Sequence, residues 1–437
     1  MKIKRFFQRF LPSVVSQTLG SVASNVKSYL KLFRLRNLLF LISSGSVSQF
    51  GDRLTHMLLI TLVGVASPGK VSAFSKASLT FTLPVILFSP IIGALVDRWS
   101  KRSIMIRAHI IQAILLAITP FLIARTHSFF PFWIVVTLFF TIDIFNNTAK
   151  PALLPNLVAK RKLLMANSLD QFISRFATVA GMVLGGFLIQ KIGWQWGMIF
   201  NACTHLCAGL LVFGIITQNI PYQIQQLKTE FNFFQTFVSL VRDIKEVFIL
   251  MRRDIFVSIV LLSFAMITFV ASVSYTILIF LVQQVLNWKT SGVGIMSGIL
   301  AIGMIFGALA VGIIPLKISK FKIIGLGFLV YAVLFIIGPF LIVKSFLIIV
   351  ALLGGIIFSL IIVAQNTILQ EDVLPEIRGR IFSIKEFAGN IMFVITSIIV
   401  GILSDLTSYR IMLLFTGGLL LIFALFVLLI RNNLRIK

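Results

Sequence analysis

The sequence predicts an all-α polytopic membrane protein, with twelve transmembrane helices arranged as two six-helix pseudo-repeat bundles. Three observations predict this fold. The chain of 437 residues is 58% hydrophobic and only 12% charged, whereas soluble domains are about 25% charged. Its apolar residues fall into segments of about 20 residues, the length that crosses a bilayer as a helix. Lys and Arg gather in alternate connections between these segments, as expected for connections on the cytoplasmic side.

Residues 1–37 form a basic arm in front of the first apolar segment. The arm contains no acidic residue, and Gln8 and Arg9 interrupt its short apolar patch. A signal peptide needs a longer apolar core. We therefore expect a cytoplasmic arm that lies on anionic lipid.

The apolar segments that follow are the predicted transmembrane helices. The N-terminal bundle covers residues 38–217, the C-terminal bundle covers residues 255–430, and residues 431–437 form a cytoplasmic tail. In chain order the predicted spans are 38–63, 77–96, 103–124, 129–149, 167–190, 196–217, 255–282, 291–315, 323–343, 345–369, 383–404 and 410–430.

The distribution of basic residues predicts the orientation. With the N-terminus in the cytoplasm, the cytoplasmic segments hold 30 Lys and Arg residues and the external segments hold 7. An excess of Lys and Arg is characteristic of cytoplasmic loops. We expect an integral protein of the plasma (inner) membrane, with both termini in the cytoplasm. The basic residues lie between apolar runs, so nucleic acid is not an expected partner.

The longest internal connection, residues 218–254, separates the two bundles. From Phe231 to Met251 it has apolar residues at helical spacing and a cluster of charged residues. This pattern favours an amphipathic helix on the cytoplasmic membrane face over a linker without regular structure.

A weak internal repeat supports the division into halves. Residues 168–188 align without gaps on residues 383–403, with identities that include Ser168 with Ser383 and Gly186 with Gly401. The alignment places the fifth span on the eleventh. Parallel halves of this kind are a known transporter architecture.

The connection after the second span carries a motif of charged residues. It runs from Gly93 through Asp97, Arg98 and Lys101 to Arg102. A carboxylate at this point can cap the N-terminus of a neighbouring helix, and the basic residues can hold carbonyls, carboxylates or lipid phosphates. The alternative is a plain positive cytoplasmic loop.

This motif resembles the Gly-x-x-x-Asp-Arg-x-Gly-Arg-Lys signature of the major facilitator superfamily, with Ser100 in place of the second glycine. In that family the motif latches the two halves together in the outward-open state. The resemblance covers about residues 38–430.

Further segments resemble the macrolide-efflux and enterobactin-exporter branch of that family. They are Ser48 to Asp52 in the first span, Pro151 to Pro155 followed by Ala166 to Leu169, and Leu369 to Arg380. This resemblance implies a secondary active transporter that exports small molecules.

The fifth span contains three glycines, Gly181, Gly185 and Gly186. They resemble the antiporter motif Gly-Pro-x-x-Gly-Gly of facilitator exporters, with Met182 in place of the proline. The same pattern also lets two membrane helices pack closely. Both interpretations stand.

Polar residues follow one face of three predicted spans in the N-terminal half, at spacings of three and four residues. Ionisable groups inside a membrane usually face a cavity, so these residues are candidates for a proton or substrate site. The candidates are Gln49, Asp52, Arg53 and His56 in the first span, Asp143, Asn146 and Asn147 in the fourth, and Asp170 and Arg175 in the fifth.

The residue pattern is compatible with two roles for these groups. Asp52 with His56 could relay protons, because histidine titrates near neutrality, and Asp143 is the first candidate for coupling. The alternative is that Asp52, Arg53, Asp143 and Arg175 form structural ion pairs. His109 and His205 are single residues on apolar helices, and we expect them to be structural.

The C-terminal spans are poorer in charge, which suits an amphipathic substrate. We expect proton-coupled efflux of drug-, macrolide- or siderophore-type molecules by a monomer in the lipid bilayer. A lipid or lysophospholipid transporter of the same fold is the first alternative, and a non-transporting membrane protein is the second. The sequence contains no nucleophile–base pair, metal cluster or ATP-binding loop, so we expect neither an enzyme nor a cofactor or metal.

Overall fold

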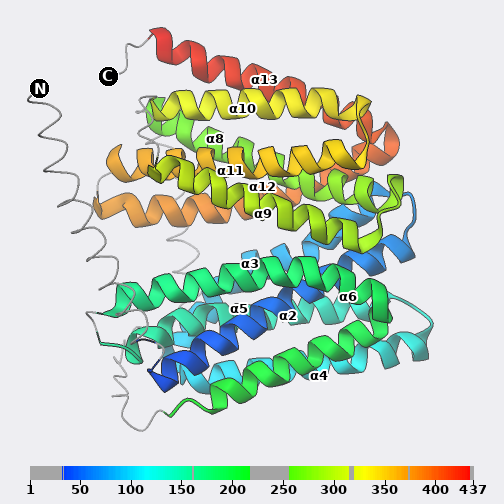
Figure 1. Ribbon diagram of the computed structural model, residues 1–437, viewed down its shortest axis with the longest axis vertical. Helices are drawn as coiled ribbons and strands as arrows, with labels where there is room; N and C mark the ends of the chain where they lie inside the picture. The colour runs from blue at the N-terminus through cyan, green and yellow to red at the C-terminus, as the bar shows by residue number, and fades with distance from the viewer. Residues whose placement is uncertain are drawn as a thin grey trace, which may run out of the picture.

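The computed structural model describes residues 32, 34–159, 162–216, 255–313, 319–372 and 375–433, and all regular structure in this part is helical. The helices form two bundles, seen one above the other in Figure 1. The predicted all-α polytopic fold is confirmed. In a bilayer, backbone groups must bond within their own segment, and the helix achieves this.

The lower bundle in Figure 1 is the N-terminal one. Its helices are α2 (Arg36–Ala66), α3 (Val71–Arg98), α4 (Lys101–Thr126), α5 (Phe130–Leu153) and α6 (Leu163–Phe213), with the short helix η1 (Leu154–Asn156) after α5.

The upper bundle contains the C-terminal helices. They are α8 (Ile255–Val273), α9 (Lys289–Ile313), α10 (Lys320–Ile337), α11 (Lys344–Asp372), α12 (Pro375–Leu406) and α13 (Tyr409–Asn433), with the short helices η3 (Ser274–Leu278), η4 (Leu281–Val285) and η5 (Gly338–Phe340). The segments η3 and η4 are π-helical and continue α8.

Within the described residues, ten helical stretches are long and apolar enough to cross a membrane. Helix α2 is not among them, because polar residues along it lower its hydropathy. Helix α6 counts once, although Gly193, with φ 82° and ψ 163°, breaks it into two helices. Twelve crossings therefore require α2 and both halves of α6 to span, and the count of twelve stays a prediction.

Local sequence explains several helix ends. The hydroxyl of Ser100 accepts a hydrogen bond from the backbone N–H of Ser103 and so caps the start of α4. Gly69, with φ 78°, lies in the turn between α2 and α3 and adopts a conformation that glycine accepts readily. Ser100, which replaces the usual glycine of the charged motif, therefore has a helix-capping role of its own.

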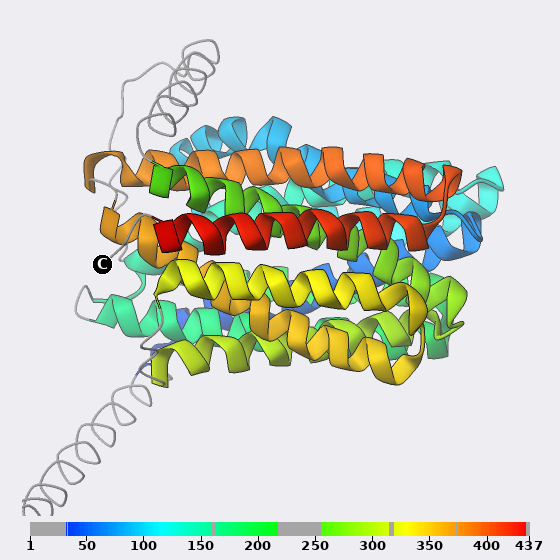
Figure 2. The ribbon, with the colours of Figure 1, turned by 90° about the horizontal axis from the view of Figure 1, so that it is seen from above.

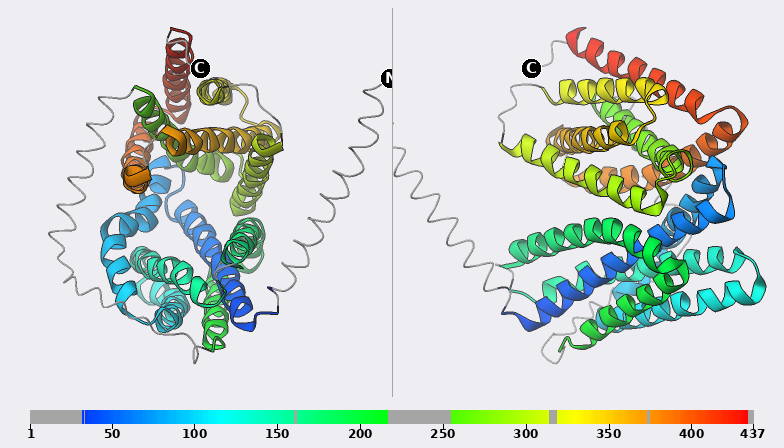
Figure 3. Two further views of the ribbon diagram at one scale, coloured as in Figure 1. Left: turned by 90° about the vertical axis from the view of Figure 1, so that its left-hand side faces the viewer. Right: turned by 45° about the vertical axis from the view of Figure 1, so that its right-hand side comes forward.

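The two bundles meet along two helix pairs. Helix α3 packs against α12, and α6 packs against α9. Figure 2 shows the helices of both bundles running roughly in one direction, and the end-on view in Figure 3 shows the bundles as two groups. The start of α2 and the end of α13 lie at the same end of the molecule (Figure 1).

Three predictions fall wholly or largely outside the described residues. They concern the basic arm within residues 1–37, the amphipathic segment within 218–254, and the tail at 431–437, of which only residues 431–433 are described, as the end of α13. They stay predictions.

Candidate functional site

The polar faces predicted for three spans meet in the N-terminal bundle. The ammonium group of Lys150 on α5 lies 2.6 Å from Oδ1 of Asp170 on α6, and it donates to the hydroxyl of Ser174 at 3.1 Å. One turn further along α6, the hydroxyl of Thr178 donates to Oε1 of Gln49 on α2 at 3.4 Å. These contacts connect α2, α5 and α6 through polar side chains.

Asp170 thus has a cationic partner that sequence reasoning did not assign to it. Lys150 belonged to a predicted cytoplasmic segment, yet its ammonium group lies between α5 and α6, and both side chains are only about 15% exposed. Arg175, the neighbour of Ser174, is exposed.

Asp143 on α5 is half-buried and faces charged and amide groups. Its Oδ2 accepts a hydrogen bond of 2.7 Å from the side chain of Asn147, and Arg53 on α2 lies within electrostatic reach. Its Oδ1 is buried without a hydrogen-bond partner among the described residues. Asp143 therefore lies among the amide groups of Asn147 and Gln112 and close to a cation.

Asp52 points into the core of the N-terminal bundle. Its side chain is 4% exposed, and its Oδ1 lies 3.8 Å from Nε2 of His205 on α6, whose side chain is fully buried. Its Oδ2 accepts a long hydrogen bond of 3.4 Å from Nε2 of Gln49. Asp52 thus lies between the polar side chain of Gln49 and a buried imidazole.

The core around His205 contains further polar groups from two other helices. The ring of His109 on α4 lies 5.8 Å from the ring of His205. Asn146 on α5 donates to Oε1 of Gln112 on α4 at 3.0 Å and lies 3.4 Å from Nδ1 of His109. The four helices α2, α4, α5 and α6 all contribute polar side chains to this buried cluster.

Sequence reasoning treated His109 and His205 as isolated, and the signal that links them was present. His109 and Gln112 are three residues apart on α4, and Asn201 and His205 are four apart on α6. Each pair lies on one helix face. The sequence did not reveal these polar faces, because the helices as a whole are strongly apolar.

His56, four residues after Asp52 on α2, packs among aromatic rings. Its ring contacts Phe81 on α3 at 4.9 Å and Phe140 on α5 at 4.8 Å between centroids. Phe81 in turn lies 5.5 Å from Tyr275 in η3 of the other bundle. His56 therefore belongs to an aromatic cluster between the bundles, and the imidazole beside Asp52 is that of His205.

The three glycines of the fifth span lie at two helix interfaces. A Cβ atom at Gly181 would lie 2.9 Å from the carbonyl oxygen of Phe50 on α2, and one at Gly186 would lie 2.9 Å from that of Thr290 on α9. Gly185 faces Leu54 on α2. The glycines thus let α6 approach both its own bundle and the opposite one.

Within the charged motif between α3 and α4, the structure describes the contacts of Arg102. The guanidinium of Arg102 donates to the carbonyl oxygens of Phe213 at 2.6 Å and Val212 at 3.4 Å. A cation at the C-terminus of a helix is favourable, so Arg102 stabilises the end of α6. A Cβ atom at Gly93 would meet no other atom within 4 Å. Lys101 takes part in an interaction with another residue. The side chains of Asp97 and Arg98 lie outside the described part of the structure.

Polar side-chain contacts between the bundles lie at the end away from the start of α2. There the hydroxyls of Thr61 and Thr290 are 2.7 Å apart, and Gln284 donates to the carbonyl oxygen of Gly64 at 3.1 Å. The hydroxyl of Ser78 donates to that of Ser397 at 3.2 Å. These contacts close this end of the interface between the bundles.

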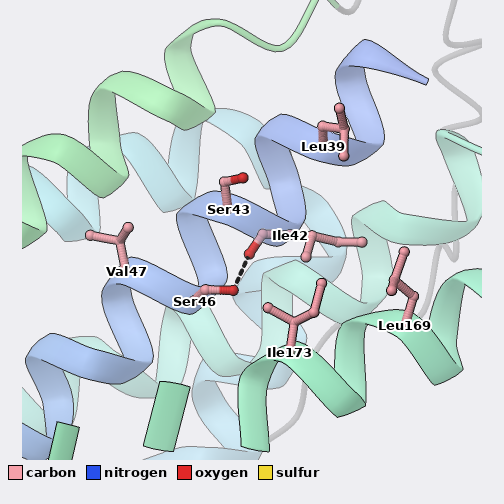
Figure 4. Close-up of a pocket in the computed structure, with 7 residues that line it drawn as sticks. All are labelled: Leu39, Ile42, Ser43, Ser46, Val47, Leu169 and Ile173. Carbon is pink, nitrogen blue, oxygen red and sulfur yellow. Dashed lines mark hydrogen bonds between the residues drawn. The ribbon is translucent and has the colours of Figure 1, made fainter. Parts of the chain in front are cut away.

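An apolar cavity of about 280 Å³ lies nearer the other end, between α2 and the first half of α6 (Figure 4). The hydroxyl of Ser46 in its wall donates to the carbonyl oxygen of Ile42 at 2.8 Å. The lining residues are Leu39, Ile42, Ser43, Ser46, Val47, Leu169 and Ile173. The cavity combines an aliphatic wall with two hydroxyl groups. Among the described residues, no group of three or more His, Cys, Asp or Glu side chains could hold a metal ion.

Comparison with known proteins points to one superfamily. The family model described as "Major Facilitator Superfamily" matches residues 41–384. The putative bacilysin exporter BacE of Bacillus subtilis is 23% identical over 78% of this chain and 82% of its own length. Macrolide efflux protein A of Streptococcus pyogenes is 23% identical over 79% of this chain and 83% of its own.

Solved structures share the fold at lower identity. The nucleoside transporter NupG superposes with a TM-score of 0.67 at 14% identity, over 90% of this chain and 98% of that one. A bacterial homologue of the lysosomal transporter Spinster, in an inward-facing conformation, gives 0.64 at 12% identity over 90% and 95%.

Proposed function

Because the chain belongs to the major facilitator superfamily and is a transporter, we propose that it exports small amphipathic molecules in exchange for protons. The direction is supported by relatives whose names describe an exporter and an efflux protein. In this proposal the two bundles rock about a central site, which opens to each side of the membrane in turn.

The observation that carries alternating access is the one-sided contact between the bundles. The contacts of Thr61 with Thr290 and of Ser78 with Ser397 lie at the end opposite the start of α2. If the termini are cytoplasmic, as the basic residues predict, this arrangement is closed to the outside. Transport then requires the contacts at this end to break and re-form in each cycle.

Proton coupling is supported by carboxylates within the membrane-spanning helices. Asp143 and Asp52 lie on α5 and α2, close enough to influence each other electrostatically, with Arg53 nearby. Two carboxylates that share one site do not both ionise easily. Such a pair can take up a proton on one side of the membrane and release it on the other.

The cavity between α2 and α6 supports an amphipathic substrate. Its aliphatic lining suits an apolar group, and the hydroxyls of Ser43 and Ser46 can bond to a polar one. Ligand sites commonly combine a mainly apolar wall with a few polar groups.

The test is flux in sealed inside-out vesicles under an imposed pH gradient, with a panel of macrolides and lipophilic cations. We expect accumulation of at least one compound only when the vesicle interior is acidic, and collapse when a protonophore is added. If every compound of the panel is taken up equally with and without the pH gradient, the proposal of proton coupling is wrong.

The same cavity favours a second candidate function, the transport of a lipid or lysophospholipid. An aliphatic cavity between two membrane helices suits an acyl chain. Fluorescent lysophosphatidylcholine separates the two proposals. Its transfer between leaflets by the purified protein, with no flux of the soluble panel, would favour the lipid transporter.

We also propose the plasma membrane as location, cytoplasmic termini and a monomeric state. The apolar helices support residence in a membrane. Because each bundle contributes one side of the proposed path, a single chain supplies the whole path.

A further inference from the structure

We propose that Asp52 and His205 together form a proton-binding pair in the core of the N-terminal bundle. This inference rests on the proposed proton-coupled function and names where the exchanged proton is held. The sequence predicted His56, four residues along α2, as the imidazole partner of Asp52, whereas this inference assigns that role to His205 on α6.

The geometry places the pair out of contact with solvent. Oδ1 of Asp52 lies 3.8 Å from Nε2 of His205, and the two side chains are 4% and 0% exposed. This distance is too long for a hydrogen bond, but it is short for two opposite charges. A proton bound by either group would therefore be felt by both, so its titration belongs to the pair.

Apart from the long hydrogen bond between Gln49 and Oδ2 of Asp52, the polar atoms of the pair lack hydrogen bonds in the described part of the chain. Both ring nitrogens of His205 and Oδ1 of Asp52 are buried without a hydrogen bond. Nε2 of His109, whose ring is next to that of His205, is also buried without a hydrogen bond. Buried polar atoms are almost always bonded, so several exceptions in one cluster call for an explanation. A proton taken up by His205 would give the carboxylate of Asp52 a cationic partner at 3.8 Å.

Charged and titratable groups approach the pair from every helix around it. Arg53 lies next to Asp52 on α2, Asp143 and Lys150 act on it from α5, and His109 faces His205 from α4. The charge balance near Asp52 therefore includes another carboxylate and two fixed cations. A movement of α5 relative to α2 would change this balance, which gives the transport cycle a means of releasing the proton.

The bound proton is expected to be single. Taking up a proton either makes His205 an imidazolium beside the carboxylate of Asp52 or makes Asp52 a neutral acid beside the imidazole. A second imidazolium on His109, with its ring 5.8 Å away, would repel the first. One proton per molecule then enters and leaves the pair.

Gly51 positions the two groups. A Cβ atom there would lie 2.9 Å from Nε2 of His205 and 2.7 Å from Oδ1 of Asn201. Real Cβ contacts are rarely this short, so only glycine lets the polar face of α6 approach α2 at this level. Gly51 immediately precedes Asp52, and the pairing of these two residues in the sequence thus has a structural reason.

The first measurement needs no substitution. Wild-type protein with labelled histidine rings and aspartate carboxyl groups is titrated by NMR between about pH 5 and pH 8. We expect the His205 ring and the Asp52 carboxyl to move together with one midpoint. If neither signal moves, or if only one of them moves, the proposal is wrong.

The second measurement counts protons taken up by purified protein after an acid jump, with pyranine as the indicator. We expect Asp52→Asn and His205→Gln each to remove about one proton per molecule, and the double variant to remove no more than either single one. Gly51→Ala should shift the midpoint while keeping the count. Additive losses in the double variant would overturn the shared site.

The same preparations separate this inference from the proposed function. If wild-type vesicles carry out pH-driven flux but the pair does not titrate, the inference fails and the function stands. If the pair titrates but no pH gradient drives flux, the proton site stands and the coupled function fails. Melting temperatures of all variants, measured in parallel, show whether a lost proton reflects a lost fold.

Discussion

The carboxylate of Asp405 at the end of α12 accepts hydrogen bonds from the backbone N–H groups of Val71 and Ser72. Its Oδ1 is 2.7 Å from the nitrogen of Val71 and its Oδ2 is 3.2 Å from that of Ser72. These are the first two residues of α3, in the other bundle, and a helix N-terminus attracts negative charge. Asp405 therefore holds the two bundles together at the end where they meet.

Replacing Asp405 with Asn should weaken this closure. The change keeps the shape and removes the charge, which is worth about 1 kcal/mol at a helix N-terminus, or about a fivefold shift in the equilibrium. We expect longer distances between spin labels at Ser128 and Val343, in connections of the two bundles at this end. Cys203 and Cys207 are free and exposed, so both need replacing first.

The matched control for Asp405 is Thr407→Ala. Thr407 directly follows α12, and among the described residues its hydroxyl bonds to the carbonyl oxygen of Leu403 at 2.7 Å. We expect its label distances to equal those of the parent protein. If the distribution of label distances is unchanged in the Asp405 variant, the carboxylate of Asp405 does not contribute to closing this end of the molecule.

A side chain at Gly401 should block the same closure sterically. A Cβ atom there would lie 3.0 Å from Cα of Ser72 and 2.8 Å from Cβ of Ser75, across the bundle boundary. Gly401→Val is therefore expected to populate a state open at this end and to slow transport at least tenfold, an estimate on the order of 1.4 kcal/mol. Gly418→Val on α13, where a Cβ atom meets nothing within 4 Å, should transport normally.

Asp143→Asn should abolish pH-driven accumulation while leaving the protein folded. Asn147 can still bond to the new amide, so the local contact survives, whereas the negative charge that acts on Asp52 is lost. Asp143→Glu keeps the carboxyl group and should restore part of the coupling. Flux and melting temperature are measured together.

A structural role for Asp143 predicts the opposite result. Loss of one partner of a buried ion pair costs about 3–5 kcal/mol, so Asp143→Asn would then melt early. Unchanged pH-driven flux in this variant would exclude Asp143 from coupling.

Asp170 should contribute to stability through Lys150. Asp170→Leu leaves the ammonium group of Lys150 without its partner at 2.6 Å, and we expect a loss of about 3 kcal/mol. The double variant with Lys150→Met removes both charges and should recover most of it, since apolar replacement of a whole buried pair is often neutral. A double variant as unstable as the single one would show that Asp170 acts through another group.

The orientation is tested by reporter fusions. Fusions after Lys228 and Lys437 should both report the cytoplasm, because 30 of the 39 Lys and Arg residues lie in the segments assigned to that side. An external signal at either position contradicts an even number of crossings between the reporters and the N-terminus. It would also reverse the assignment of the closed end.

The sequence alone was sufficient for the fold class and for the polar faces. Apolar segments of membrane length predict helices because a bilayer leaves backbone groups no other partner. The spacing of Gln49, Asp52 and Arg53, and of Asp143 and Asn147, placed polar groups on one side of each helix. The motif near Asp97 predicted the superfamily, and the family match agrees.

Only the tertiary structure decided which faces meet. A spacing of three and four residues defines a face but not its rotation toward a neighbour. The sequence therefore paired Asp52 with His56 and predicted a structural role for His205, and only the packing of α6 brings His205 to Asp52. The polar residues of α4 and the second half of α6 are also few within strongly apolar helices, and hydropathy averages them away. Their importance comes from convergence in one core, which is a property of the packed bundle. Asp52, His109 and His205, which lie more than 50 positions apart in the sequence, meet only when four helices assemble.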